Sequence, residues 1–263
     1  MRQISADGLT YYQFDHLAAR DDIVHGVFTR KGGVSTLPWA SLNLSRSTGD
    51  SLEAVTENNR RLLSVLGLAP GQTVSAWLNH GSRVALVGPQ HWGTALKDTD
   101  ALISNTPGLA LSMRFADCVP VLFHAAARGA VGIAHAGWPG VVANILPATV
   151  RAMRESFGCH PGDLWAGIGP AIRVECYQFG IDLAQRVAAA CPPGAPILHP
   201  QSKDVLYLDL IAAVKSQLQA EGVTDIEDSG ICTACHTDEW FSHRVEKKTG
   251  RFGVVIGLRQ FDA

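Results

Sequence analysis

Charge, long hydrophobic runs and basic segments are all scarce in this sequence of 263 residues. Charged residues make up 17% of the chain, the formal net charge is −2, and no run of Lys and Arg is longer than two residues. Because a nucleic-acid surface needs a concentrated basic face, we expect no nucleic-acid partner. No stretch approaches the roughly 18 consecutive apolar residues of a membrane span, so we expect no membrane partner either.

The N-terminal residues and the cysteines bear on the cellular compartment. The sequence begins Met-Arg-Gln-Ile-Ser-Ala-Asp, which lacks the apolar core of a secretory signal peptide. The six cysteines are scattered, without the density of a disulfide-stapled scaffold. Together these features predict a reducing, cytoplasmic setting, in which thiols serve as metal ligands or nucleophiles.

The chain contains enough apolar residues for a large core. Hydrophobic residues make up 46% of it, and because no linker, repeat or low-complexity segment interrupts them, we expect one domain over residues 1–263. Strand-like runs outnumber helical patterns and do not alternate with them strictly, which predicts an α+β fold with a mixed sheet. We expect strands near residues 24–28, 73–77, 83–87, 109–113, 119–123, 131–135, 164–168 and 252–258. We expect helices at residues 51–66, within 141–157, and at 182–190 and 208–220.

The most informative stretch lies between residues 114 and 140. Cys118 comes at the N-terminal edge of one apolar run, and His135 ends the next. A thiolate and an imidazole at the ends of adjacent strands can converge on a metal ion or form a Cys/His catalytic dyad. The small residues Ala136 and Gly137 would keep the space above His135 open. A buried structural cysteine beside an ordinary core histidine also fits this pattern.

Two polar residues of the helix expected at 51–66 are candidates for binding. The apolar stripe runs through Leu52, Val55, Leu62 and Leu66, and Asn59 falls on it. A buried amide must be hydrogen-bonded, either to backbone or to something bound. The adjacent Arg60 is a candidate for holding an anion or a hydroxyl group.

Two loops carry further polar candidates. Residues 29–35 combine Arg30 and Lys31 with two glycines, which indicates an anion-binding turn, although the spacing is not that of a P-loop. His80 lies between two expected strands, where a single histidine is either solvated or functional.

A Cys-Thr-Ala-Cys-His sequence at residues 232–236 matches the attachment pattern of c-type haem. Haem attachment requires an exported protein, so we expect no haem there. A zinc knuckle would need further ligands, and only His243 is near in sequence. The sequence therefore predicts that Cys232 and Cys235 are reduced thiols in a loop.

Many short motifs together resemble those of the YfiH-like proteins. These have been called laccase-domain or multicopper polyphenol oxidases and are now regarded as purine nucleoside enzymes. The resemblance is ordered along residues 24–258. Its motifs are His-Gly-Val-Phe-Thr-Arg-Lys-Gly-Gly-Val-Ser (25–35), Leu-Asn-Leu-Ser (42–45), Gly-Asp (49–50), Asn-Arg (59–60), Asn-His-Gly (79–81), Asp-Ala-Leu-Ile (100–103), Ala-Asp-Cys-Val-Pro-Val (116–121), Ala-His-Ala-Gly-Trp (134–138), Gly-Pro-Ala-Ile (169–172), Cys-Thr-Ala-Cys (232–235), Phe-Ser-His-Arg (241–244) and Thr-Gly-Arg (249–251).

The resemblance implies a single layered α-β-β-α domain with a catalytic zinc ion. The zinc ligands it implies fall on His80, Cys118 and His135, which leaves a fourth position open for substrate or water. The implied activities are phosphorolysis of adenosine, inosine, guanosine and S-methyl-5′-thioadenosine, and hydrolytic deamination of adenosine. The partners are then purine nucleosides and phosphate, and we expect a monomer or a weak homo-oligomer.

Phosphorolysis needs a cation for phosphate and polar groups for the ribose. The sequence offers Arg30, Lys31, Arg60 and Arg244 as cations, and Asn43 and Asn59 for ribose hydroxyls.

Three other functions compete with this one. A copper-dependent phenol oxidase would follow the older family label, but multicopper sites use His-x-His pairs, and this sequence has none. A metal-free hydrolase would use Cys118 as nucleophile and His135 as base. A binding module without catalysis is the third alternative.

Overall fold

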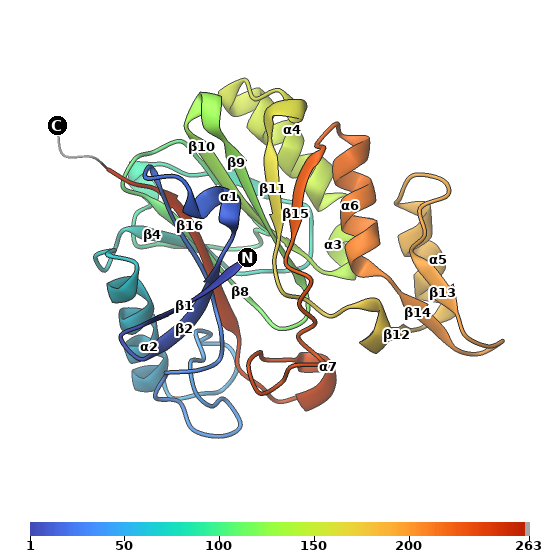
Figure 1. Cartoon of the computed structure of the whole chain (residues 1–263), viewed down its shortest axis with the longest axis horizontal. Helices are drawn as coiled ribbons and strands as arrows, with labels where there is room; N and C mark the ends of the chain where they lie inside the picture. Colours follow the sequence, from blue (N-terminus) through green and yellow to red (C-terminus); the bar gives the residue numbers. More distant parts are fainter. Residues whose placement is uncertain (261–263) are drawn as a thin grey trace.

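Two mixed β-sheets lie face to face at the centre of the computed structural model, which describes residues 1–260 (Figure 1). The last three residues of the domain expected over residues 1–263 lie outside this range. The first sheet has the order β1-β2-β3-β16-β8-β4-β6. Its strands are β1 (Arg2–Ala6), β2 (Leu9–Gln13), β3 (Ile23–Phe28), β16 (Phe252–Leu258), β8 (Ala110–Phe115), β4 (Thr73–Ala76) and β6 (Ala95–Leu96).

The second sheet has the order β15-β11-β9-β10-β7-β5. Its central strands β9 and β10 are antiparallel neighbours and completely buried, so each reads as a continuous apolar run. Its strands are β15 (Asp225–Asp228), β11 (Trp165–Ile168), β9 (Val119–Ala125), β10 (Ala130–Ala136), β7 (Ala101–Ser104) and β5 (Val84–Leu86).

Helices cover the outer faces of both sheets. Helix α2 (Leu52–Val65) packs Leu62 against the first sheet, and α4 (Ile145–Phe157) packs Val150 and Met153 against the second. Helices α3 (Trp138–Val142) and α6 (Leu210–Ala220) extend this second helical layer (Figure 1). The α+β class and the α-β-β-α layering are thereby confirmed.

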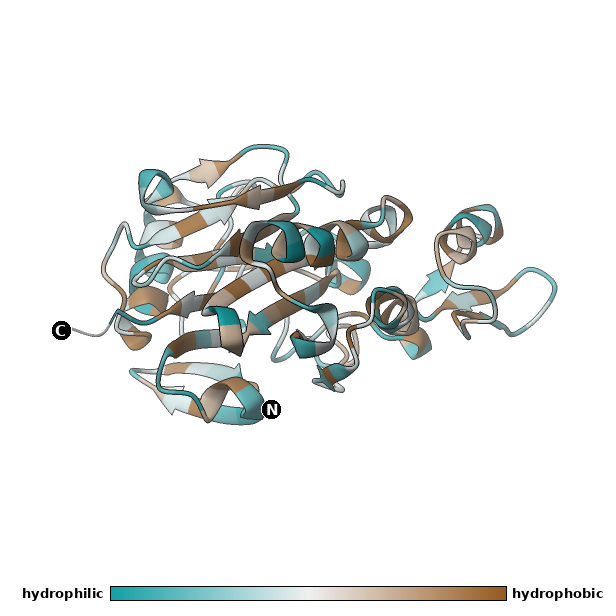
Figure 2. Cartoon of the chain, turned by 90° about the horizontal axis from the view of Figure 1, so that it is seen from above, coloured by the Kyte–Doolittle hydropathy of each residue, from teal (hydrophilic) through white to brown (hydrophobic). Residues whose placement is uncertain are grey.

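Apolar residues fill the space between the layers. The core between the sheets includes Val254 and Ile256 from one sheet and Leu122 and Ile133 from the other. Figure 2 shows hydrophobic residues following the strands in the middle of the molecule. None of the helices within residues 1–260 combines the length and the apolarity that crossing a membrane demands.

A small third sheet extends from one end of the molecule, beside helix α5 (Figure 1). Its strands have only two or three residues each, too few for a hydrophobic period, and the sequence did not predict them. The remaining elements are β12 (Gln178–Phe179), β13 (Leu198–Pro200), β14 (Leu206–Leu208), α1 (Asp15–Ala18), α5 (Ile181–Ala189), α7 (His243–Glu246), and the 3₁₀ turns η1 (Pro89–His91), η2 (Ala126–Arg128), η3 (Pro161–Asp163) and η4 (Val174–Cys176).

All eight expected strands and all four expected helices are present, but one detail of α2 was wrong. The apolar stripe does not include Leu52, which is 56% exposed, and Asn58 rather than Asn59 occupies the fully buried position. The amide of Asn58 donates to Ser35 Oγ and to the carbonyls of Ser41 and Asn43. The apolar stripe is rotated because loop 29–45 packs beside the helix. The backbone groups of this loop need hydrogen-bond partners, and Asn58 provides them.

Candidate metal centre and its pocket

Three side chains from distant parts of the sequence converge beside the ends of β9 and β10. Cys118 directly precedes β9, His135 lies near the end of β10, and His80 lies in the loop between β4 and β5. The antiparallel register pairs Ala136 with Val119, which brings the two strand ends together. One ligand atom from each of the three side chains lies within 4.8 Å of the others, and Cys118 Sγ is 3.9 Å from His80 Nε2.

The buried carboxylate of Asp100 holds this arrangement in place. Its Oδ1 lies 3.0 Å from His135 Nδ1 and accepts the backbone N–H of His80 at 3.0 Å. Its Oδ2 accepts the backbone N–H groups of Asn79 and Gly81. Because a carboxylate accepts the Nδ1 proton of His135, the Nε2 of this histidine is left free to bind a metal.

The electrostatics favour an ionised thiol. Although burial acts to raise it, the histidines His135 and His80 lower the pKa of Cys118 to about 6. Burial acts to lower the pKa of His135, but Cys118 and Asp100 outweigh it and raise that pKa to about 9. Thiolate is the form of cysteine that binds metals and attacks electrophiles.

Gly137 leaves the space that the thiol and one imidazole occupy. A Cβ at this position would lie 2.9 Å from Cys118 Sγ and 3.1 Å from His80 Cδ2. No side chain larger than hydrogen therefore fits without moving a candidate ligand. A small residue is therefore required at this position beside Cys118 and His80.

These residues fit a catalytic metal ion. Two imidazoles and one thiolate form a ligand set that zinc accepts, and three protein ligands leave one position open. His80 is exposed and Cys118 is half-buried, so solvent and substrate can reach these side chains. A histidine fixed by a carboxylate is a frequent companion of such sites.

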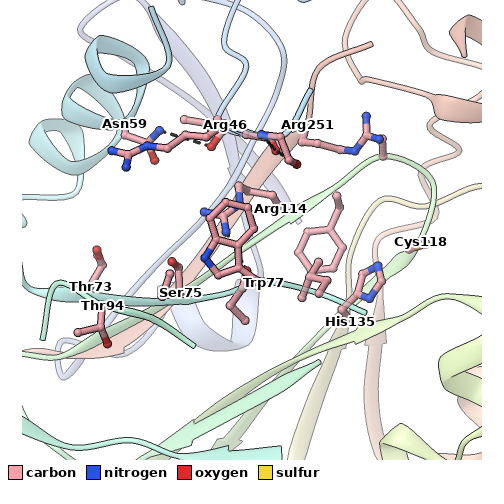
Figure 3. A pocket seen from close by; sticks show the side chains of 18 of the residues that line it. Arg46, Asn59, Thr73, Ser75, Trp77, Thr94, Arg114, Cys118, His135 and Arg251 are labelled. Carbon is pink, nitrogen blue, oxygen red and sulfur yellow. Dashed lines mark hydrogen bonds between the residues drawn. The ribbon is translucent and has the colours of Figure 1, made fainter. Parts of the chain in front are cut away.

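A cavity of about 570 Å³ opens from the three candidate ligands. Figure 3 shows Asn59, Arg46 and Arg251 along one wall, Cys118 and His135 at one end, and Arg114 between. The other residues labelled there are Thr73, Ser75, Trp77 and Thr94.

The three arginines give this cavity a positive charge. Within residues 1–260 none of them forms an ion pair with a carboxylate, and the guanidinium groups of Arg114 and Arg251 donate to backbone carbonyls. Burial, followed by the positive charge of Arg46, lowers the pKa of Arg114. Burial likewise lowers the pKa of Arg251. Both shifts mean that a bound anion would relieve an electrostatic cost.

A second cavity, of about 390 Å³, meets the first at His80 and Cys118. Its walls include Trp138, Tyr177 and Arg244, and His243 lines both cavities. The candidate metal centre therefore lies where a polar, cationic cavity joins one with aromatic walls. A ligand with an anionic or hydroxylated part and a planar ring can contact both.

The structure brings only some of the predicted binding residues into these cavities. Asn59 lines the first, and Arg244 lines the second and stacks over the ring of Tyr177 at 4.8 Å. Arg60 points away from both and pairs with Glu57 at 2.7 Å.

Asn43, Arg30 and Lys31 also lie outside the two cavities. Asn43 is fully buried. Its Nδ2 donates to the carbonyl of Ser45 in its own loop, and its Oδ1 accepts the backbone N–H of Arg251. Arg30 is held by Glu246 at 2.9 Å, and Lys31 lies near Asp238 and Glu239.

Sequence reasoning missed Asp100 and the arginines of the first cavity. Asp100 and Arg251 lie inside the quoted motifs at residues 100–103 and 249–251, and Arg46 directly follows the motif at residues 42–45. The sequence therefore contained these residues in or beside the motifs that carry the resemblance. Their position there had no physical meaning until the fold placed these residues around one cavity.

Known proteins resemble this chain over nearly its whole length. Residues 24–259 match the family described as multi-copper polyphenol oxidoreductase laccase. The chain is 39% identical over 238 residues to purine nucleoside phosphorylase ORF3 of Streptomyces griseus, which covers 89% of this chain and 94% of that protein. It is 35% identical over 248 residues to purine nucleoside phosphorylase YlmD of Geobacillus stearothermophilus, which covers 90% of each.

Solved structures agree with these relationships. The crystal structure of YlmD from Geobacillus stearothermophilus superposes with a TM-score of 0.93 at 33% identity and covers 98% of both chains. The crystal structure of Bacillus licheniformis hypothetical protein YfiH gives a TM-score of 0.91 at 30% identity and covers 97% of both. The resemblance to YfiH-like proteins is confirmed.

Proposed function

This chain belongs to the family described as multi-copper polyphenol oxidoreductase laccase, and from this membership and the geometry of its site we propose that it is a zinc-dependent enzyme of the purine nucleoside phosphorylase type. The proposed reactions are phosphorolysis of adenosine, inosine, guanosine and S-methyl-5′-thioadenosine, and hydrolytic deamination of adenosine. The observation that carries the proposal is the cluster of Arg46, Arg114 and Arg251 beside the candidate metal ligands.

We assign the phosphate to this arginine cluster. Phosphate is a small dianion, and guanidinium groups bind its oxygens with charge-assisted hydrogen bonds. In the reaction a phosphate oxygen forms a bond to C1′ of the ribose while the C1′–N9 bond breaks. The departing purine keeps the electron pair and gains a proton. Asn59, on the same wall, is placed to hold a ribose hydroxyl.

The proton for the departing base is assigned to His243, which lines both cavities. Its Nδ1 donates a hydrogen bond to the carbonyl of Lys247 at 2.8 Å. Its Nε2 is therefore the atom free to carry and release a proton. The aromatic walls of the second cavity, Trp138 and Tyr177, suit the planar purine ring.

The metal ligands in this proposal are His80, Cys118 and His135. Zinc bound by them supplies Lewis-acid chemistry, which polarises a substrate group and lowers the pKa of water. The surrounding residues orient the reactants. Asp100 fixes His135 and the backbone at His80, and Gly137 leaves the thiolate room. Deamination of adenosine would take place beside the same three residues.

A phosphate-dependence assay tests the reaction type. Purified enzyme is incubated with inosine, with and without phosphate, and hypoxanthine, ribose and ribose 1-phosphate are separated by chromatography. We expect hypoxanthine and ribose 1-phosphate in equal amounts, and only with phosphate. Free ribose formed at the same rate without phosphate would make the enzyme a hydrolase. With adenosine, adenine reports phosphorolysis, and inosine together with the hypoxanthine formed from it reports deamination.

Arginine variants test where the phosphate binds. Arg46→Gln and Arg251→Gln should each raise the apparent KM for phosphate by about tenfold or more, because each removes a charge-assisted hydrogen bond. The matched variant Arg60→Gln tests the sequence prediction, since Arg60 lies outside the cavity. A raised KM in Arg60→Gln alone would place the phosphate at α2 and refute our assignment.

The family description and the Cys118–His135 pair each favour a second candidate. A copper phenol oxidase follows the description, and a nucleophilic thiol follows from the lowered pKa of Cys118. Elemental analysis and a phenol oxidation assay test the first. For the second, Cys118→Ala distinguishes the two roles: a ligand variant loses metal and activity together, whereas a nucleophile variant loses activity with the metal retained.

A further inference from the structure

A second cluster of metal-ligating side chains lies apart from the two histidines and Cys118. The Sγ atoms of Cys176, Cys232 and Cys235 lie within 4.8 Å of one another. Cys176 and Cys235 are 3.2 Å apart although 59 residues separate them. Cys235 also has a carboxylate neighbour, since Oε1 of Glu175 lies 3.8 Å from its Sγ.

The backbone holds these cysteines in place from two sides. Cys176 ends the short 3₁₀ turn η4, and Cys232 forms a β-bridge with Ala171, a few residues earlier in the same segment. The backbone N–H of Ala171 donates to Ile231, and that of Thr233 donates back to Ala171. The segments 171–176 and 231–235 are therefore already paired, and the thiols meet at one end of this pairing.

Cys232 and Cys235 are free thiols in a turn, as the sequence predicted, and the fold places a third thiol, that of Cys176, beside them. A Cys-x-x-Cys pair becomes a metal site when the fold adds further ligands, and here the fold adds Cys176 from outside the motif. A disulfide between Cys176 and Cys235 would leave Cys232 unused, and all six cysteines are free thiols in this structure.

We propose that Cys176, Cys232 and Cys235 bind a structural zinc ion, with the carboxylate of Glu175 as the fourth ligand. Three thiolates and a carboxylate form a closed tetrahedral set, in contrast to the open set of His80, Cys118 and His135. Binding replaces three S–H bonds with three Zn–S bonds and releases three protons to solvent, without any change of oxidation state. The motif at residues 232–235 is then half of a zinc site.

This zinc ion would stabilise a wall of the proposed active site. Thr233, inside the Cys-x-x-Cys turn, donates its hydroxyl to Asp117 at 2.7 Å. The other carboxylate oxygen of Asp117 accepts the backbone N–H of Arg244 at 2.6 Å. Asp117 directly precedes Cys118. Fixing the turn therefore fixes the segment that presents Cys118 and Arg244 to the second cavity.

Zinc analysis of four proteins, each purified under reducing conditions with added zinc, tests the proposal. Wild type should hold about two zinc ions per chain, and His80→Ala and Cys235→Ser about one each, because each variant removes one ligand of a different site. Cys191→Ser is the control, since Cys191 lies outside both clusters, and it should hold about two. Cys235 is exposed, so its replacement by the isosteric serine leaves the core packing intact.

Thiol labelling gives a second measurement that does not depend on activity. Cys235 should react with a maleimide only after zinc is removed with a chelator, because a zinc thiolate is shielded. Four results would overturn the proposal: a zinc content near one in wild type that falls to zero in His80→Ala, an unchanged zinc content in Cys235→Ser, labelling of Cys235 that zinc does not slow, or a Cys176–Cys235 disulfide in non-reducing peptide mass spectra.

Discussion

A buried hydrogen bond joins Asp100 Oδ1 to His135 Nδ1 at 3.0 Å. The same carboxylate accepts three successive backbone N–H groups, from Asn79 to Gly81, and so also sets the position of His80. One side chain thus positions two of the three candidate metal ligands. Although burial opposes it, the bond to His135 and these backbone donors lower the pKa of Asp100, which keeps the carboxylate ionised.

Replacing Asp100 with Asn should weaken metal binding. The side-chain nitrogen of asparagine cannot accept hydrogen bonds, so its amide cannot serve both His135 and the backbone N–H groups. His80 and His135 therefore lose their fixed positions. We expect the zinc affinity to fall by about 10–100-fold, measured by competition with a chromogenic chelator. Asp98→Asn is the control, because Asp98 is exposed nearby and should keep wild-type affinity. Equal affinities in all three proteins would contradict this account of Asp100.

Gly137→Ala should damage the candidate metal centre while the fold is kept. The added Cβ would lie 2.9 Å from Cys118 Sγ, so the thiolate or the helix must shift. We expect zinc affinity to fall by about tenfold, because metal ligands tolerate little displacement. Gly180→Ala is a close control, since Gly180 also precedes a helix and a Cβ there meets open space. If Gly137→Ala bound zinc as tightly as Gly180→Ala, the site would tolerate displacement of its ligands, and this prediction would be wrong.

The two adjacent asparagines of α2 should differ in their contribution to stability. Asn58 is fully buried and its amide bonds four groups, among them the backbone N–H of Val34. Removing it leaves buried polar groups without partners, so Asn58→Ala should lower the free energy of unfolding by about 2–4 kcal/mol. Asn59→Ala should cost less, because Asn59 is only half-buried. Urea denaturation of both variants checks this, and equal losses would contradict the placement of Asn58, rather than Asn59, on the buried face of α2.

The stability of the protein should fall in acid partly through His25. Burial, with the charge of Arg2, lowers the pKa of His25 to about 3, and its Nε2 accepts the backbone N–H of Phe14 at 3.0 Å. The folded state therefore requires the neutral ring, whereas an unfolded histidine takes up a proton near pH 6.5. This contribution is complete above pH 6.5 and is lost as the pH falls from 6.5 towards 3, with no further loss below.

The loss should reach about 1.4 kcal/mol per pH unit in the steep part of that window, because one more proton is bound in the unfolded state. His25→Gln keeps an acceptor for Phe14 but cannot titrate, so its stability should depend less steeply on pH between 6.5 and 4. Denaturation at several pH values measures the difference. The exposed His160 provides the control, and a His160→Gln slope as shallow as that of His25→Gln would refute the assignment.

The sequence by itself determined the central strands and two of the candidate ligands. Buried strands such as β9, β10 and β16 are continuous apolar runs, which are visible without any partner. Cys118 and His135 were predictable because they flank two successive runs that a short turn makes antiparallel neighbours. Strand β1 has exposed edge positions and β15 is rich in acidic residues, so neither carries such a pattern.

Only the tertiary structure decided which polar residues meet. Arg46, Arg114 and Arg251 come from three separate segments, and the sequence favoured Arg60, which points to solvent. Cys176 joins the Cys-x-x-Cys motif in the same way, across 59 residues. Hydrophobic periodicity reports the burial of each residue relative to its own element, so it predicts local structure. The convergence of polar side chains depends on how the sheets and loops pack, and that information is distributed over the whole chain.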